Sequence, residues 1–188
     1  EPATFGGGGG RGTCNSRGGR GAGRIVLQGA TVRINGVVRA DGEAAAAGGC
    51  GNAGGGGAGG SIWIEAGSFT GNGAITAQGG GGQNGGAGGR IYVHHTGSNT
   101  FSGAIAAFAG SGGSPAAGTA YVVDATNALI AQGGNIFLEA AAAHPSITLR
   151  AGGTTTIRGA STITQPITVP AGTTLILDAS DALTNLTI

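Results

Sequence analysis

The sequence predicts an all-β protein, a parallel β-solenoid (β-helix) with coils of roughly 20 residues. The first observation behind this prediction is a repeat of four segments that each open with glycine and continue as an alternating strand. They lie at residues 23–27, 60–64, 89–93 and 118–122. The second observation is a short strand-like piece after each of the first three, at residues 36–40, 73–77 and 103–107. A unit this short cannot bury its own apolar face, so stacking of neighbouring units has to do it.

The third observation is a repeat in the C-terminal part of the chain. Residues 147–152 align with residues 167–172, twenty positions later. We therefore expect glycine-rich coils over residues 1–117 and compact coils over residues 118–188 that continue the same stack. A β-sandwich of short strands is the alternative fold; it would explain the composition but not the twenty-residue register.

Glycine tracts separate the repeated strands in the N-terminal half. Ten glycines fall within residues 6–23, nine within 48–60 and eight within 79–89. Such tracts are either flexible loops or ordered polyglycine helices of the polyproline II type, with three residues per turn. Ordered helices would pack side by side, because successive tracts leave the stack at the same corner.

The overall composition excludes several classes of protein. The 188 residues include 45 glycines and no lysine, only 9% are charged, and the net charge is +1. No apolar run is long enough to span a membrane, and this much glycine disfavours a helical bundle. Arginines alternate with glycines over residues 11–24, as in RNA-binding segments, but the small net charge and the lack of interleaved aromatic residues argue against a nucleic-acid partner.

The two cysteines occupy near-equivalent places in consecutive tracts. Cys14 lies ten residues before Arg24, and Cys50 lies eleven residues before Ser61. This spacing predicts a disulfide between them, with two free thiols as the alternative. A disulfide would indicate an oxidising compartment and therefore secretion.

No catalytic, metal or cofactor site is predicted. The eight acidic residues form no paired cluster of the kind that glycoside hydrolysis needs. His94 and His95 are adjacent on a predicted strand, so they point to opposite sides and are interpreted as surface residues rather than joint metal ligands. Threonines at positions 154–156, 162, 164, 173 and 174 suggest an ice-binding face, but their spacing is not kept between coils.

Three aromatic residues occupy equivalent positions in successive repeats. Trp63, Tyr92 and Tyr121 each stand between two apolar residues of their strand, which predicts that they point outward as a ladder. Such a ladder either stabilises the sheet through side-chain contacts or stacks on sugar rings.

The two ends of the sequence are strand-like and carry no evident cap. We expect Leu183, Leu186 and Ile188, together with Phe5, to serve as assembly residues. A head-to-tail contact of this kind builds an open filament by adding a strand to a neighbour. The alternative is that the chain is a fragment of a longer rod.

The repeats resemble those of a known class of proteins. The motifs that carry the resemblance are Gly-Gly-Ala-Gly-Gly-Ser-Ile-Trp-Ile-Glu-Ala-Gly at residues 56–67, Gly-Ala-Ile-Thr-Ala-Gln-Gly-Gly at 73–80 and Gly-Gly-Arg-Ile-Tyr-Val at 88–93. They resemble the glycine-rich parallel β-helix repeats of large secreted bacterial surface and filament proteins, which are similar in kind to filamentous-haemagglutinin and pectin-lyase-like β-helices. The resemblance spans residues 20–125 and implies an extracellular or cell-surface location and a structural or adhesive role.

The expected function is therefore that of a secreted structural protein without enzymatic activity. It would be a subunit of an extracellular filament or the rod of a surface adhesin. Its partners would be further copies of itself and a surface polysaccharide. The alternative is a carbohydrate- or ice-binding module.

Overall fold

The described part of the chain consists of short strands, turns and extended glycine tracts. The structure, a computed structural model, describes residues 3–13, 16–47, 53–123, 129–131, 134–137, 147–149, 153–158, 162–163, 167–177, 182–183 and 186–187. No helix occurs within these ranges. Accordingly, none of these residues belongs to a helix that is long and apolar enough to cross a bilayer.

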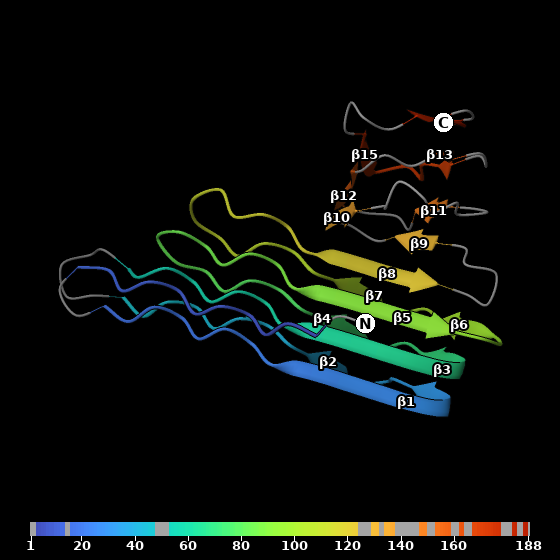
Figure 1. Ribbon diagram of the computed structural model, residues 1–188, viewed down its shortest axis with the longest axis horizontal. Coiled ribbons are helices and arrows are strands. Elements are labelled where there is room, and N and C mark those ends of the chain that lie inside the picture. Colours follow the sequence, from blue (N-terminus) through green and yellow to red (C-terminus); the bar gives the residue numbers. More distant parts are fainter. Residues whose placement is uncertain are drawn as a thin grey trace.

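The strands of the N-terminal half form two parallel layers (Figure 1). The first layer consists of the long strands β1 (Arg24–Arg33), β3 (Ser61–Gly71), β5 (Arg90–His95) and β8 (Thr119–Val123), with β6 (Asn99–Phe101) paired to the second part of β3. The second layer is a separate sheet of β2 (Val37–Arg39), β4 (Ala74–Thr76) and β7 (Ala104–Ala106). A long strand together with the short strand that follows it is called a rung below.

The strands of the C-terminal half are shorter and belong to three sheets. The sheet that contains β1, β3, β5 and β8 continues through β9 (Leu129–Ala131), β11 (Ile147–Leu149), β14 (Ile167–Thr168) and β17 (Leu186–Thr187). A second sheet contains β10 (Gly134–Phe137), β12 (Gly153–Arg158) and β15 (Thr173–Leu177). The third pairs β13 (Thr162–Ile163) with β16 (Ala182–Leu183).

Equivalent residues of the sequence repeats are register partners. Ile25 pairs with Ile62, Ile62 with Ile91, and Ile91 with Ala120. In the C-terminal half Ile147 pairs with Ile167, as the twenty-residue repeat predicts. Residues of one kind therefore lie above one another in columns that run across the strands.

The core lies between the two layers of the N-terminal half. The side chains of Ile62, Ile64, Ile91 and Val93 are completely buried, whereas the residues between them are half-buried. This alternation follows from the period of two along a strand. At the far end of β3, Phe69 stacks on Phe101 with ring centroids 4.6 Å apart.

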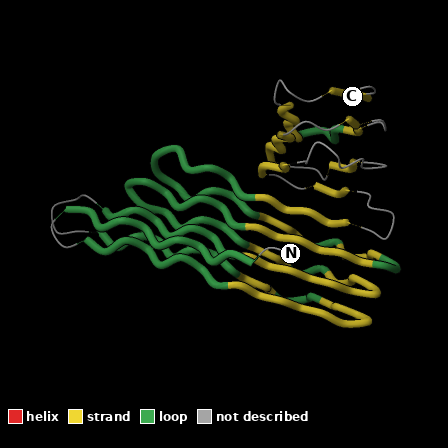
Figure 2. The backbone as a smooth tube through the Cα atoms, in the orientation of Figure 1, coloured by secondary structure: helices red, strands yellow, loops and turns green. Residues whose placement is uncertain are grey.

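The glycine tracts extend together from one side of the sheets (Figure 2) and pair through their backbones. Amides of residues 55–60 donate to three different neighbouring segments in rotation, with N···O distances of 2.8–2.9 Å. The donor–acceptor pairs are Gly55–Gly10, Ala58–Gly7, Gly56–Asn84, Gly59–Ala87, Gly57–Glu43 and Gly60–Ala40. Each neighbour is thus contacted at every third residue, which is the periodicity of a polyproline II chain. We call this assembly of tracts the glycine bundle.

Close backbone approach explains the glycines inside this bundle. A Cβ atom on Gly56 would overlap the carbonyl oxygen of Gly80, and one on Gly9 would overlap that of Gly55. By contrast, a Cβ atom on Gly7 or Gly10, at the outer surface of the bundle, would meet nothing within 4 Å.

The prediction of one parallel β-solenoid with coils of about 20 residues is wrong. The described strands form four open sheets and no closed solenoid, and the largest sheet is mixed because β8 pairs with β9 in antiparallel orientation. Only five residues separate β8 from β9, whereas a parallel connection needs a dozen or more. In addition, the register partners of the N-terminal rungs lie 37 and 29 residues apart, because the glycine tracts belong to the repeating unit.

Candidate functional site

The first rung leaves one end of the N-terminal core uncovered. Within the described residues β1 pairs only with β3, and β2 pairs only with β4, so both are edge strands. Leu27, Val32 and Val38 pack against the core cluster but remain only partly buried. We call β1, β2 and these three side chains the open end.

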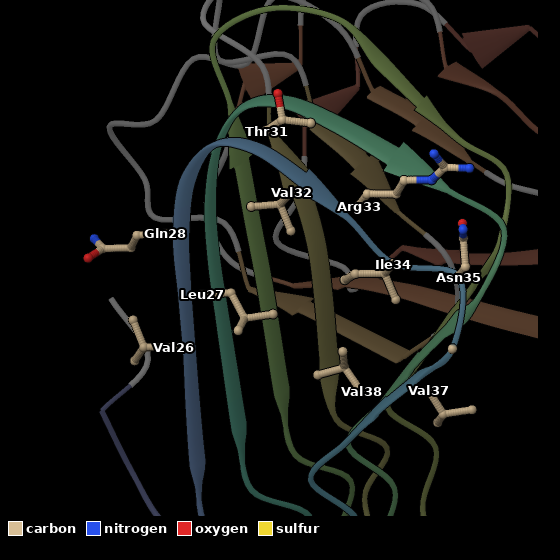
Figure 3. A pocket seen from close by; sticks show the side chains of 11 residues that line it. Val26, Leu27, Gln28, Thr31, Val32, Arg33, Ile34, Asn35, Val37 and Val38 are labelled. Carbon is tan, nitrogen blue, oxygen red and sulfur yellow. The ribbon is translucent and has the colours of Figure 1, made fainter.

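The open end is hollowed. A depression of about 580 Å³ is lined by β1, β2 and the turn between them. Figure 3 shows Leu27, Val32, Ile34 and Val38 pointing into it, while Gln28 and Asn35 point away. At the same hollow, Val26 and Val37 are 41% and 58% exposed. The hollow is lined by apolar side chains of the core end and also by the polar residues Gln28, Thr31, Arg33 and Asn35. It lies beside two strand edges that pair with no further strand among the described residues, and such edges can accept an added strand.

A second candidate site lies on the outer face of the long strands. Trp63 is the register partner of Tyr92, and Tyr92 is the register partner of Tyr121. All three side chains are half-buried, whereas the neighbouring Ile62, Ile64 and Ile91 are fully buried. The structure therefore brings the three predicted residues together on the outer face; we call them the aromatic column.

Polar residues flank the aromatic column toward the C-terminal ends of the strands. Gln28, Glu65 and His94 are register partners on β1, β3 and β5. The amide Nε2 of Gln28 donates to Glu65 Oε2 at 2.9 Å, and His94 Nδ1 lies 3.9 Å from Glu65 Oε1. Burial, reinforced by the negative charge of Glu65, raises the pKa of Tyr92 above its ordinary value. The Tyr92 phenol is therefore neutral at physiological pH.

On the other side of the aromatic column, the N-terminal segment of the chain is hydrogen-bonded to the strands through Thr4. The Ser61 hydroxyl donates to the carbonyl oxygen of Thr4 at 2.6 Å, and the Arg90 guanidinium donates to the Thr4 hydroxyl. Between this segment and the strands lies a pocket of about 460 Å³, lined by Ala3, Thr4, Arg90, Ile91, Tyr92, Thr119 and Tyr121. The local sequence pattern does not predict these hydrogen bonds, because nothing in it links Thr4 to Ser61, which lies 57 residues away.

The residues predicted for assembly do not gather at one place in the fold. Phe5 is 74% exposed and lies outside the strands. Leu183 pairs with Ile163, and Leu186 pairs with Ile167. Ile188 lies outside the described residues, as do both partners of the predicted disulfide, Cys14 and Cys50.

The two adjacent histidines face opposite sides, but only one lies at the surface. His94 points outward beside Glu65. His95 is 5% exposed, and its Nδ1 lies 2.9 Å from the carbonyl oxygen of Gly97. Interpreting both as surface residues was therefore wrong for His95, which sits on the inward-facing set of β5.

Asp41 has a structural role that the sequence pattern does not predict. Its carboxylate accepts hydrogen bonds from the Thr76 hydroxyl at 3.0 Å and from the Gln78 amide at 2.7 Å, and it lies 3.2 Å from Arg39 Nε. These contacts join the ends of β2 and β4. A single aspartate just after a strand was the only signal available.

No group of three or more His, Cys, Asp or Glu side chains that could hold a metal ion occurs among the described residues. Comparison of the chain with models of known protein families, with curated proteins and with solved structures found no match. The arrangement of residues on the open end and on the outer face is therefore the basis for proposing a function.

Proposed function

We propose that this chain is an extracellular structural protein that assembles head to tail by adding strands at the open end. The observation that carries the proposal is the hollowed end of the core at β1 and β2, where Leu27, Val32 and Val38 remain only partly buried. Proteins normally cover or blunt such edges with charges, proline or a capping element. Here Arg33 and Arg39 are the exposed charges on the two edge strands, and the exposed Val26 and Val37 stand on the same strands. No capping element covers these edges among the described residues.

The columns of side chains support the addition of a strand at this position. A strand paired to β1 would place its inward residues over Leu27 and Val32, as Ile64 and Phe69 of β3 already do on the opposite side. Its backbone would form hydrogen bonds with the N–H and C=O groups at the outer edge of β1, which is the usual basis of strand addition. The incoming rung would thus repeat contacts already present inside the molecule.

A second copy of the same chain is the proposed source of that strand. Strands β1 and β17 stand at the two ends of the order in the largest sheet. Joining β17 of one copy to β1 of the next would continue that sheet across the contact, a heterologous arrangement that builds filaments. With 9% charged residues and a net charge of +1, little electrostatic repulsion opposes such stacking.

Sedimentation velocity and electron microscopy of the full chain test the proposal. We expect filaments for the wild type and monomers for Leu27→Lys, because an added rung would bury the new ammonium group, whereas the free open end leaves it in water. Val37→Lys serves as a second variant, since Val37 is exposed and outside the core. Phe108→Lys, which also replaces an exposed apolar residue but away from the open end, is the control and should assemble like the wild type.

A single monomeric species of the wild type at every concentration would overturn assembly by this chain. Filaments of Leu27→Lys and Val37→Lys equal to those of the wild type would overturn the role of the open end. Circular dichroism of each variant shows whether its strands have formed.

A further inference from the structure

The pocket beside the aromatic column is formed by three separate parts of the chain. Tyr92 of β5 and Tyr121 of β8 are register partners and supply its aromatic surface. The N-terminal residues Ala3 and Thr4 form the opposite side. The hydrogen bonds that Thr4 accepts from Ser61 and Arg90 hold this segment against the strands, so it forms a wall that the sheet alone would lack.

The polar groups of this pocket are suited to hydroxyl groups. Arg90 offers five N–H donors, and its contact with Thr4 engages only part of this capacity. Within the described part of the chain the hydroxyl groups of Thr119 and Tyr92 make no hydrogen bond. The neutral Tyr92 phenol can both donate and accept.

Charge favours a neutral ligand over an ionic one. Arg90 lies on one flank of the column and Glu65 on the other, so neither sign dominates. The Glu65 carboxylate is already contacted by Gln28 and His94. An apolar aromatic surface with a few hydrogen-bonding groups around it is typical of sites for polyhydroxylated ligands.

We propose that this pocket binds a neutral polysaccharide, a chain of β-linked hexoses that lies along the aromatic column from Tyr121 toward Trp63. The column crosses three parallel strands, at about 4.8 Å per strand, so it matches a run of sugars rather than a single one. This site is on the outer face of the sheet and is separate from the open end. The proposal is therefore independent of head-to-tail assembly.

Binding of neutral oligosaccharides to the full chain tests this inference. The probes are cellohexaose, mannohexaose and laminarihexaose, with oligogalacturonate as an acidic comparison. Trp63 is the single tryptophan of the chain, so its fluorescence reports on the column directly, and isothermal titration calorimetry gives a second readout. We expect at least one neutral hexasaccharide to bind and to bind more tightly than oligogalacturonate.

Variants locate the binding within the molecule. Tyr121→Ala should weaken binding about tenfold or more, because it removes the aromatic contact. Thr119→Val keeps the side-chain shape, so it tests the hydroxyl without disturbing the sheet. Phe108→Ala removes an exposed aromatic ring outside the pocket and should bind like the wild type.

Three results would overturn the inference. The first is that none of the three neutral probes binds by either readout. The second is equal affinity of Tyr121→Ala, Thr119→Val and Phe108→Ala. The third is tighter binding of oligogalacturonate than of every neutral probe, which would make Arg90 an anion site instead.

Discussion

Gly56 lies so close to Gly80 that the two tracts contact each other backbone to backbone. A Cβ atom on Gly56 would overlap the Gly80 carbonyl oxygen, and the Gly56 amide donates to Asn84 at 2.8 Å. The spacing between tracts in the glycine bundle is therefore set by the absence of side chains.

Replacing Gly56 should separate the tracts. We expect Gly56→Ala to lower the free energy of unfolding by about 1–3 kcal/mol, as over-packing does in other interiors. Gly10→Ala is the matched control, because a Cβ atom there meets nothing within 4 Å. This control should be neutral or up to about 1 kcal/mol more stable, since alanine restricts the unfolded chain. Urea unfolding of both variants checks the prediction, and equal stability would contradict it.

The stacked pair of Phe69 and Phe101 closes the far end of the N-terminal core. Phe69 is fully buried, so Phe69→Ala should cost about 3–5 kcal/mol of unfolding free energy. Phe108→Ala changes a ring that is 42% exposed and should stay within about 0.5 kcal/mol of the wild type. Thermal unfolding followed by circular dichroism distinguishes the two; a similar loss in both would show that Phe69 does not anchor the core.

The carboxylate of Asp41 joins consecutive short strands. Removing both acceptors in Asp41→Ala should cost about 1–3 kcal/mol, because the Gln78 amide and the Thr76 hydroxyl lose their partner. Asp41→Asn keeps one acceptor oxygen and should cost less. The order of denaturation midpoints in urea, wild type above Asn above Ala, is the expected outcome. An alanine variant as stable as the wild type would sink this assignment.

The raised pKa of Tyr92 predicts a loss of stability at alkaline pH. The folded protein holds the phenolic proton more tightly than the unfolded chain does. The contribution of the protonated Tyr92 phenol to the free energy of unfolding is therefore complete below the ordinary tyrosine pKa of about 10. It is lost as the pH rises through the higher pKa of Tyr92 in the folded state. We expect the wild type to lose more stability than Tyr92→Phe between these limits, as measured by urea unfolding at a series of pH values. Identical pH profiles would contradict the prediction.

The disulfide between Cys14 and Cys50 remains a prediction from the sequence. It would close a loop of 36 residues, which in the entropic model stabilises the folded state by about 3–4 kcal/mol. Peptide mapping by mass spectrometry without reduction should recover the two cysteines in one cross-linked fragment. Recovery of both as free thiols from protein made in an oxidising compartment would exclude the bond.

Local patterns in the sequence were sufficient for the long strands β1, β3, β5 and β8 and for the pairing between them. The alternation around Ile62 and Ile91 predicts which side chains point inward, because successive residues of a strand face opposite sides. Repetition predicts which residues are register partners, and so it predicted the alignment of Trp63, Tyr92 and Tyr121. The composition likewise raised the possibility that the tracts are ordered, since glycine permits chains to approach closely.

The tertiary structure alone decided how these strands are connected and what lies between them. An alternating strand can pair in either direction, so the antiparallel contact of β8 with β9 follows from the short connection and not from the repeat. Several hydrogen bonds join residues far apart in the sequence. Asp41 accepts one from Gln78, and Thr4 accepts one each from Ser61 and Arg90. The open end at Leu27 exists because nothing among the described residues covers β1 and β2. A sequence records which side chains are alike, whereas these features depend on which distant segments meet in space.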